Sequence, residues 1–179
     1  VVMDLFIGLT SLTREAKVVP GLAASWDLSA DGREYTFHLR PALQWSDGAP
    51  LDASAFVFSF RRIVDPATAS PFAYRLAIIA TAARVISGEL APDQLGVSAP
   101  DAATVVIRLE EPAPWFPEII IHRGLPAPRH AIEKFGSAWI RPDRMVSNGA
   151  FELSEWVPNS HVRLTRNARF HDAQNVRLD

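Results

Sequence analysis

The sequence contains no cysteine and only two lysines. The first fact excludes sites that need a thiol, and the second bears on partners that need a basic patch. Without cysteine the chain has no disulfide, no thiolate metal ligand and no cysteine nucleophile. Lysine is limited to Lys17 and Lys134, and the 18 basic side chains, scattered without a basic block, are balanced by 20 acidic ones. Because a partner with a phosphate backbone usually requires a basic patch or stripe, we expect no nucleic acid partner.

Long hydrophobic runs and catalytic motifs are missing as well. The apolar runs are short, as at residues 119–121, whereas a membrane-spanning helix needs about 20 apolar residues. No serine lies in a G-x-S-x-G elbow, no glycine-rich loop could cradle a phosphate, and no two histidines have the i, i+4 spacing of a helical metal site. We therefore expect no metal ion, no cofactor and no enzymatic activity.

The adjacent carboxylates of Glu110 and Glu111 are the remaining candidates for acid–base chemistry. Neighbouring side chains point to opposite sides of an extended chain, so the two carboxylates would not converge. Their place between an apolar run and a proline-rich loop favours a solvated edge. A small hydrolase that uses scattered carboxylates is kept only as an alternative.

Proline is abundant, at 14 of 179 residues against a usual share of about 5%, so many segments must be extended or turning. Within this frame the periodicity of the apolar residues predicts the regular elements. Strands are expected at 35–40, with 26–28 as hairpin partner, at 95–98, at 104–109, and in a hairpin of 151–156 with 162–165. Helices are expected at 3–12, from a cap at Asp52 or Ser54 to Asp65-Pro66, from Ser70-Pro71 to Gly88, around 115–121, and at 129–135.

These elements alternate irregularly, which predicts an α+β fold built on a small mixed sheet with packed helices. Pro126-Ala127-Pro128 reads as an extended linker. The five tryptophans, each near a turn or the end of an element, are expected to fill the core. Phe72 and Tyr74, at the start of the second long helix, are expected to line a pocket.

Several strings of residues, taken in order, resemble a known family. They are LAASW at 22–26, YTFHLR at 35–40, WSDGAPL at 45–51, DPATASP at 65–71, EKFG at 133–136 and VSNGAF at 146–151. Together they resemble the extracellular solute-binding proteins of family 5, the periplasmic oligopeptide-binding components of ABC importers. Within that family the strings are most similar to the oligopeptide and murein-peptide binders.

The resemblance implies a two-lobe architecture similar to the type II periplasmic binding proteins. It implies that residues 1–128 form an accessory domain of lobe one, that residues 129–179 return into the main peptide-binding domain, and that the sequence is an internal fragment. The linker at 126–128 coincides with this boundary. We also expect a non-enzymatic protein that is exported to the periplasm by a signal peptide outside these residues, binds an oligopeptide and docks on ABC permease subunits.

The resemblance also nominates two ligand-binding residues. Phe72 stands where the family has a tyrosine that reaches the ligand cleft, so stacking is retained here and the hydroxyl hydrogen bond is lost. Asn148 is expected near the cleft in the main domain. Alternative ligands within the family are a murein peptide, a nickel chelate or haem, and an interaction domain that docks to a permease without a ligand is a further alternative.

Overall fold

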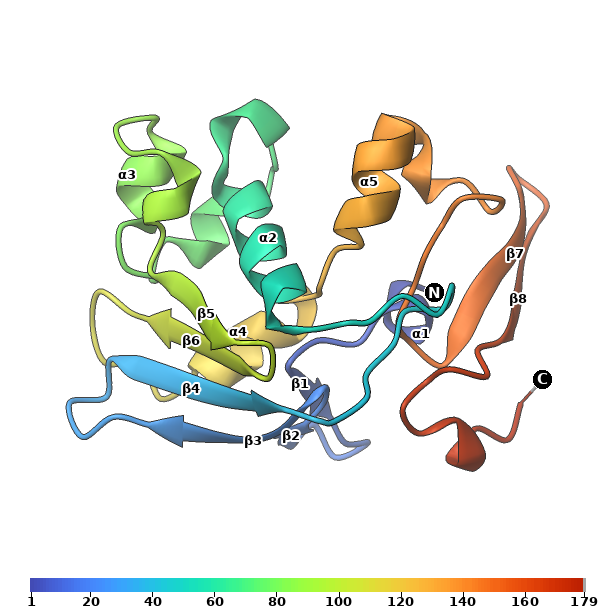
Figure 1. Ribbon diagram of the computed structural model, residues 1–179, viewed down its shortest axis with the longest axis horizontal. Helices are drawn as coiled ribbons and strands as arrows, with labels where there is room; N and C mark the ends of the chain where they lie inside the picture. The colour runs from blue at the N-terminus through green and yellow to red at the C-terminus, as the bar shows by residue number, and fades with distance from the viewer. Residues whose placement is uncertain (179) are drawn as a thin grey trace. The chain divides into compact units, whose positions relative to one another are not determined.

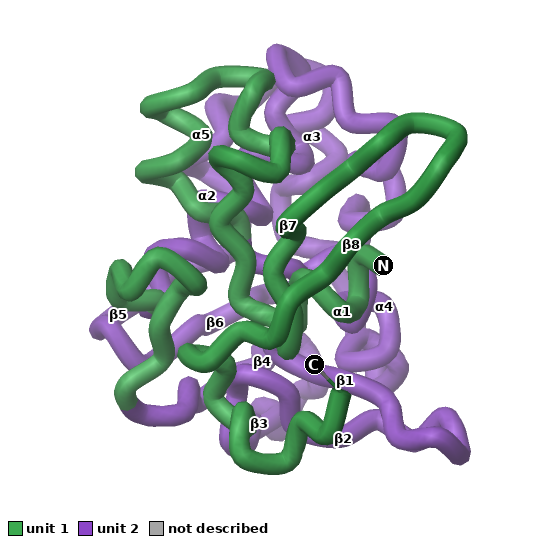
Figure 2. Tube along the Cα trace, turned by 90° about the vertical axis from the view of Figure 1, so that its right-hand side faces the viewer, with its two compact units in different colours: residues 1–7, 42–51, 127–179 green, residues 8–41, 52–126 purple. Residues whose placement is uncertain are grey.

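The computed structural model describes residues 1–178, and the chain forms two compact units (Figure 2). Unit 1 comprises Val1–Ile7, Ala42–Leu51 and Ala127–Asp179, and unit 2 comprises Gly8–Pro41 and Asp52–Pro126. The last passage from unit 2 to unit 1 falls after Pro126, inside the expected linker. The assignment of 1–128 to an accessory domain and of 129–179 to the main domain stays a prediction, and its last residue, Asp179, lies outside the described residues.

Unit 2 is built on a four-stranded sheet in the order β3-β4-β6-β5 (Figure 1). The strands are β3 (Ala23–Leu28), β4 (Glu34–Leu39), β5 (Val97–Asp101) and β6 (Thr104–Arg108). The α+β class, with helices packed on a small sheet, is confirmed. One detail differs, because the sheet expected to be mixed is antiparallel in each of its three described pairs. Short hairpin-like turns join β3 to β4 and β5 to β6, and such turns allow only antiparallel neighbours.

The alternating pattern of β4 decides which face of this sheet is buried. Tyr35 and Phe37 are almost fully buried, whereas Thr36 between them and His38 after them are only half-buried. Strand β6, which pairs with β4, repeats the alternation, with Val105 buried. Since side chains alternate across a strand, the buried residues share one face, and that face carries the core of unit 2.

Helices α2 (Ala53–Val64) and α4 (Phe116–Arg123) supply the other half of this core. Asp52 caps α2 by accepting a hydrogen bond from the Ser54 amide at 2.9 Å, as expected. Phe60 of α2 and Phe116 of α4 are fully buried. The ring of Phe116 lies 5.4 Å, between centroids, from that of Tyr35 on the sheet.

The prediction of a second long helix from 70 to 88 is wrong. The structure has a 3-10 turn, η2 (Ala73–Leu76), and a short helix, α3 (Ala82–Ile86), instead. The break lies at Thr81, whose φ of 66° is left-handed. Its amide donates to Glu110 at 2.6 Å and its hydroxyl donates to the carbonyl of Gln94 at 2.6 Å. Contacts with distant segments therefore outweigh the helical periodicity.

The helix expected at 3–12 is also wrong beyond its first turn. Residues Val2–Leu5 form α1 in unit 1, whereas Thr10–Leu12 form β1 in unit 2 and pair with β2 (Val18–Pro20). The amide of Gly21 donates to the carbonyl of Leu9 at 2.9 Å, and a Cβ on Gly21 would lie 2.5 Å from the carbonyl oxygen of Gly8. This close approach of two backbones requires glycine and an extended chain.

Unit 1 contains the elements expected near the C-terminal end. Helix α5 (Arg129–Phe135) ends at Gly136, and strands β7 (Phe151–Val157) and β8 (His161–Arg166) form the predicted hairpin. The short 3-10 segments η1 (Pro66–Thr68), η3 (Pro92–Gln94), η4 (Gly136–Ile140) and η5 (Ala173–Asn175) complete the described elements of the chain.

Candidate functional site

Phe72 lies at the surface of unit 2, where it precedes η2, and its side chain is 45% exposed. The guanidinium carbon of Arg123, the last residue of α4, lies 4.0 Å from the centroid of the Phe72 ring. This is a cation–π contact, in which the positive charge rests on the negative face of the ring. Phe72 is thus an accessible aromatic ring with a cation held against it.

A hollow of about 410 Å³ lies beside this pair, within unit 2. It is lined by Arg75, Glu118, Ile119, His122 and Arg123. The second aromatic residue expected at a pocket, Tyr74, is 63% exposed, and the guanidinium carbon of Arg75 lies 5.3 Å from its ring centroid. Both aromatic residues therefore stand next to an arginine of the same hollow.

Asn148 lies in unit 1 and is only 2% exposed. Its Oδ1 accepts a hydrogen bond from the amide of Ile7 at 3.3 Å, and its Nδ2 donates to the carbonyl of Ile7 at 2.9 Å. The side-chain amide thereby pairs with a backbone peptide group as a neighbouring strand would. Because both partners are backbone groups, this side chain fixes the position of residue 7.

The residues around Asn148 hold two further segments of unit 1. The amide of Gly149 donates to the carbonyl of Leu5 at 2.8 Å, and a Cβ on Gly149 would lie 2.6 Å from the carbonyl carbon of Leu5. Asn167, which is fully buried, donates from Nδ2 to the carbonyl of Gly149 at 2.9 Å. Segment 147–149 is therefore a buried polar junction between parts of the chain that are distant in sequence.

Ser147 joins the same junction to the turn at residues 45–48. The amide of Ser46 donates to the carbonyl of Ser147 at 2.8 Å, and the amide of Ser147 donates to Oγ of Ser46 at 3.1 Å. In the same turn, a carboxylate oxygen of Asp47 lies 2.8 Å from Nε2 of His130 on α5. Residues 45–48 form a tight turn, in which the amide of Gly48 donates to the carbonyl of Trp45 at 2.9 Å and Gly48 has a left-handed φ of 89°.

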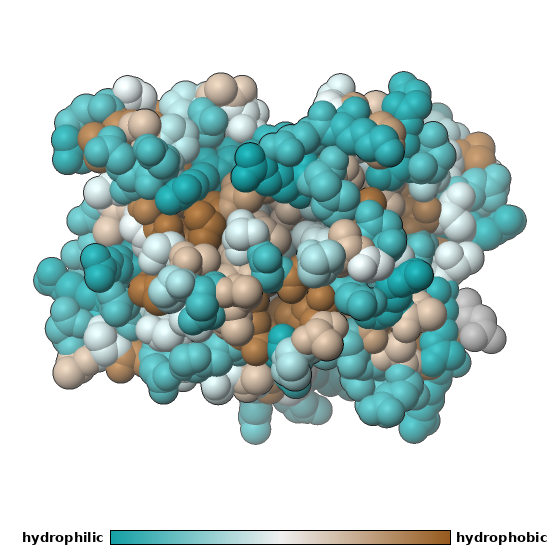
Figure 3. Space-filling view, viewed as in Figure 1, coloured by the Kyte–Doolittle hydropathy of each residue, from teal (hydrophilic) through white to brown (hydrophobic). Residues whose placement is uncertain are grey.

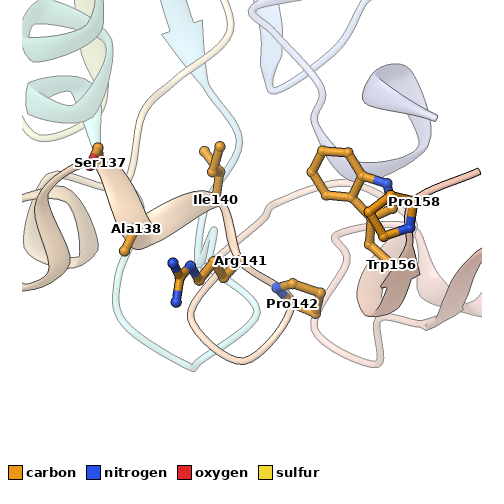
Figure 4. A pocket seen from close by; sticks show the side chains of 7 residues that line it. All are labelled: Ser137, Ala138, Ile140, Arg141, Pro142, Trp156 and Pro158. Atoms are coloured by element: carbon orange, nitrogen blue, oxygen red, sulfur yellow. The ribbon is translucent and has the colours of Figure 1, made fainter.

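A second hollow, of about 390 Å³, lies in unit 1 between η4 and the tip of the β7–β8 hairpin. Figure 4 shows Trp156 and Pro158 side by side on the hairpin, with Ile140, Arg141 and Pro142 on the neighbouring segment. Trp156 is 53% exposed and Trp115 is 50% exposed, so the expectation that the tryptophans fill the core is wrong for these two. Among the residues that line the hollow, Arg141 is charged, Ser137 is polar and the others are largely apolar.

Two carboxyl groups of β7 have shifted pKa values. Burial raises the pKa of Glu152, and the positive charge of Arg169 partly opposes this shift. The hydrogen bond from His161 lowers the pKa of Glu155, and the charge of Arg163 adds to this effect. Glu152 lines a hollow of unit 1 that Asp47 and Asp143 also line.

Among the described residues, no group of three or more histidine, aspartate or glutamate side chains could hold a metal ion. The carboxylate of Glu110 accepts the Thr81 amide and so supports the fold, and Glu111 is exposed. Hydrophobic residues on the face seen in Figure 3 form separate patches among hydrophilic ones. In residues 1–178 no helix combines the length and the apolar character needed to cross a membrane.

The structure places the two nominated residues in different units, Phe72 in unit 2 and Asn148 in unit 1. Sequence reasoning missed both arginines of the hollow beside Phe72. Arg75 lies only three residues after Phe72, but Arg123 is distant in sequence and no local pattern connects it with Phe72. Their proximity arises from the packing of α4 near η2. A basic residue in the last turn of a helix indicates only a favourable interaction with the helix dipole.

Comparison with known proteins places the chain among solute-binding proteins. Residues 17–179 match the family described as bacterial extracellular solute-binding proteins, family 5 Middle. The chain is 44% identical over 181 residues to the probable deoxycholate-binding periplasmic protein YgiS of Escherichia coli, with 99% of the chain and 34% of the relative covered. It is 41% identical to the periplasmic oligopeptide-binding protein OppA of Salmonella typhimurium, with 94% of the chain and 32% of the relative covered.

The fold is similar to that of solved structures as well. The structure of Haemophilus influenzae OppA in complex with RPPGFSPFR superimposes with a TM-score of 0.94 at 37% identity, covering 97% of this chain and 34% of that one. The chain spans about a third of the length of the curated relatives it matches. The resemblance expected from the strings at 22–26, 35–40, 45–51 and 65–71 is confirmed.

Proposed function

The chain belongs to the bacterial extracellular solute-binding proteins of family 5, and from this membership we propose that the full-length protein binds oligopeptides for import by an ABC transporter. The observation that carries the proposal is that the chain is similar, in sequence and in fold, to oligopeptide-binding proteins over nearly its whole length. The proposed role is binding without catalysis. The proposed site of action is the periplasm, and the proposed protein partners are the permease subunits of the transporter.

Peptide binding by such a protein has a simple physical basis. Hydrogen bonds to the peptide backbone, which is the same in all peptides, supply affinity as in strand addition. Hydrated pockets tolerate different side chains because water mediates their contacts. Closure of two lobes about a hinge would bury the peptide and present a changed surface to the permease. This chain would contribute part of one lobe.

Phe72 is the proposed ligand contact of unit 2. Its ring is accessible. By the resemblance of the motif around it, this position would be that of the family's cleft tyrosine. A phenylalanine offers stacking and apolar contact but no hydroxyl group. A ligand group that would pair with the tyrosine hydroxyl therefore has no partner at this position.

Asn148 is the second proposed ligand residue, and its bonds limit what it can offer. A side-chain amide has two acceptor lone pairs and two donor hydrogens. Ile7 uses one acceptor and one donor, so one of each remains for a ligand. Its larger role in this proposal is to hold the backbone at residue 7.

A second candidate ligand is an amphipathic carboxylate such as a bile acid. The observation that favours it is the 44% identity to a relative named as a probable deoxycholate-binding protein. An arginine stacked on an exposed aromatic ring offers both a cation and an apolar surface. A murein peptide is a third candidate, because the chain is 40% identical to the periplasmic murein peptide-binding protein MppA of Escherichia coli.

A thermal-shift panel on the full-length protein tests the proposal. The panel contains mixed short peptides, murein tripeptide, deoxycholate, a nickel chelate and haem. A ligand that binds only the folded state stabilises it by about 2.7 kcal/mol at a hundred times its Kd. We expect mixed peptides to raise the melting temperature. A shift produced only by one of the other compounds, with none from any peptide, would replace oligopeptide as the ligand class.

A further inference from the structure

The hollow beside Phe72 has more positive than negative charge. Arg75 and Arg123 line it together with a single carboxylate, that of Glu118. Within the described residues neither arginine forms an ion pair with an acidic side chain, although five other arginines do. The chain as a whole has a net charge of −2, so this local excess of positive charge is not a general property of its surface.

Arg123 is held in place on two sides. Its guanidinium lies against the ring of Phe72, and its backbone ends α4, directly before Gly124. A Cβ on Gly124 would lie 3.0 Å from the ring of Phe60 on α2, which is fully buried. The end of the helix is therefore packed too closely to move freely, and the arginine starts from a fixed backbone.

The contact with the Phe72 ring leaves the N–H groups of Arg123 available for hydrogen bonds in the plane of the guanidinium. A guanidinium donates in its own plane, whereas the aromatic ring occupies its face. The outward edge can therefore meet the two oxygens of a carboxylate in a bidentate pair. Because the arginine is already ordered by the ring, less side-chain entropy is lost when the pair forms.

Arg75 adds a second cation to the same hollow. It belongs to η2, only three residues after Phe72, and it is itself placed against the Tyr74 ring. Ile119 of the hollow lies on α4 and supplies an apolar contact. The arrangement suits a group that carries a negative charge at the end of an apolar stem.

We propose that Arg123, held over the ring of Phe72 and supported by Arg75, forms a subsite for a carboxylate of the ligand. The proposal rests on the proposed function, because it takes Phe72 as a residue that faces the ligand. It adds the substrate class: ligands that place a carboxylate beside Phe72 are preferred. The carboxylate can come from a glutamate side chain, from the C-terminus of a peptide or from a bile acid.

The test is isothermal titration of the full-length protein with matched ligands. One series is tetra-alanine with a single glutamate or glutamine at each position in turn. A second pair compares a free with an amidated C-terminus, and a third compares deoxycholate with its methyl ester. We expect the carboxylate member of one pair to bind about tenfold more tightly or better, since a hydrogen bond to a charged group is worth roughly that much.

Substitution of the arginine completes the test. Arg123→Gln should weaken the preferred carboxylate ligand about tenfold and leave its neutral partner within about twofold. Arg75→Gln should act in the same direction with a smaller effect. Arg14→Gln, which removes the same charge from an exposed loop of unit 2, is the matched control and should change neither ligand.

Each outcome has a defined meaning. Equal binding of every carboxylate and its neutral partner, or equal weakening of both by Arg123→Gln, overturns the subsite while peptide binding stands. If Arg123→Gln no longer discriminates between the carboxylate ligand and its neutral partner, with folding unchanged by circular dichroism, the subsite is supported. The pair that responds identifies the source of the carboxylate.

If only deoxycholate binds and Arg123→Gln weakens its binding, the subsite stands and the peptide proposal falls. If no ligand of the three pairs binds, both are overturned.

Discussion

Asn148 is buried and uses half of its hydrogen-bonding capacity on the peptide groups of Ile7. Its neighbours Ser147 and Gly149 bond to Ser46 and to Leu5, so one short segment determines the positions of two others in unit 1. The resemblance nominated Asn148 as a residue near the ligand, and the structure adds a scaffolding role. At this scale, the buried polar junction is as important to the protein as any residue that touches a ligand.

Asn148→Ala should therefore destabilise the protein markedly. The substitution leaves the part-buried amide and carbonyl of Ile7 without their partners, which costs about 1–3 kcal/mol. The free energy of unfolding in urea measures the effect. Asn175→Ala, at an exposed site where Nδ2 donates to Asp172, is the matched control and should cost less than about 0.5 kcal/mol. If the free energy of unfolding falls equally in the two variants, Asn148 has no scaffolding role.

Glu152 gives a prediction for pH dependence. Burial raises the pKa of Glu152 above its ordinary value of 4.5, so the folded state holds this proton more tightly than the unfolded chain does. The resulting stability is fully present below pH 4.5 and is lost as the pH rises through the raised pKa. Glu152→Gln cannot ionise, so the variant should gain stability relative to the wild type over that range. Urea unfolding at a series of pH values measures the difference, and a difference that does not change with pH would contradict the assignment.

At the scale of single elements, the predictions succeeded where local signals agree with packing. Helix α5 has the expected bounds of 129–135, and the hairpin of β7 and β8 follows its alternating pattern. The helix expected from 70 to 88 failed because Glu110 and Gln94, which are distant in sequence, bond to Thr81 and break it. For the same reason Phe72 could be nominated from its motif, whereas its contact with Arg123 could not be predicted.

Helix α2 offers a direct test of a local signal. Asp52→Ala removes the cap that accepts the Ser54 amide, and it should lower the free energy of unfolding by about 1 kcal/mol. Asp52→Asn keeps a side-chain oxygen at the same place. Its free energy of unfolding should fall by only a few tenths of about 1 kcal/mol, since asparagine caps about as well as aspartate. If both variants lose the same amount, the negative charge of Asp52 and not its hydrogen bond stabilises the helix.

At the scale of the whole molecule, the family could be recognised from strings of residues spread over both units. Their order along the chain carried the recognition, and the match over residues 17–179 confirms it. The division into units could be predicted only in part. The proline linker marks the passage after Pro126, but the inclusion of Val1–Ile7 and Ala42–Leu51 in unit 1 depends on contacts that no local pattern shows.

The most direct measurement for the central claim is isothermal titration of the full-length protein with a defined short peptide and with its constituent free amino acids. The account predicts one peptide bound per protein molecule, with a negative heat-capacity change from burial of apolar surface, and no binding of the amino acids. Absence of binding by a broad set of peptides, with saturable binding of a non-peptide solute, would contradict it.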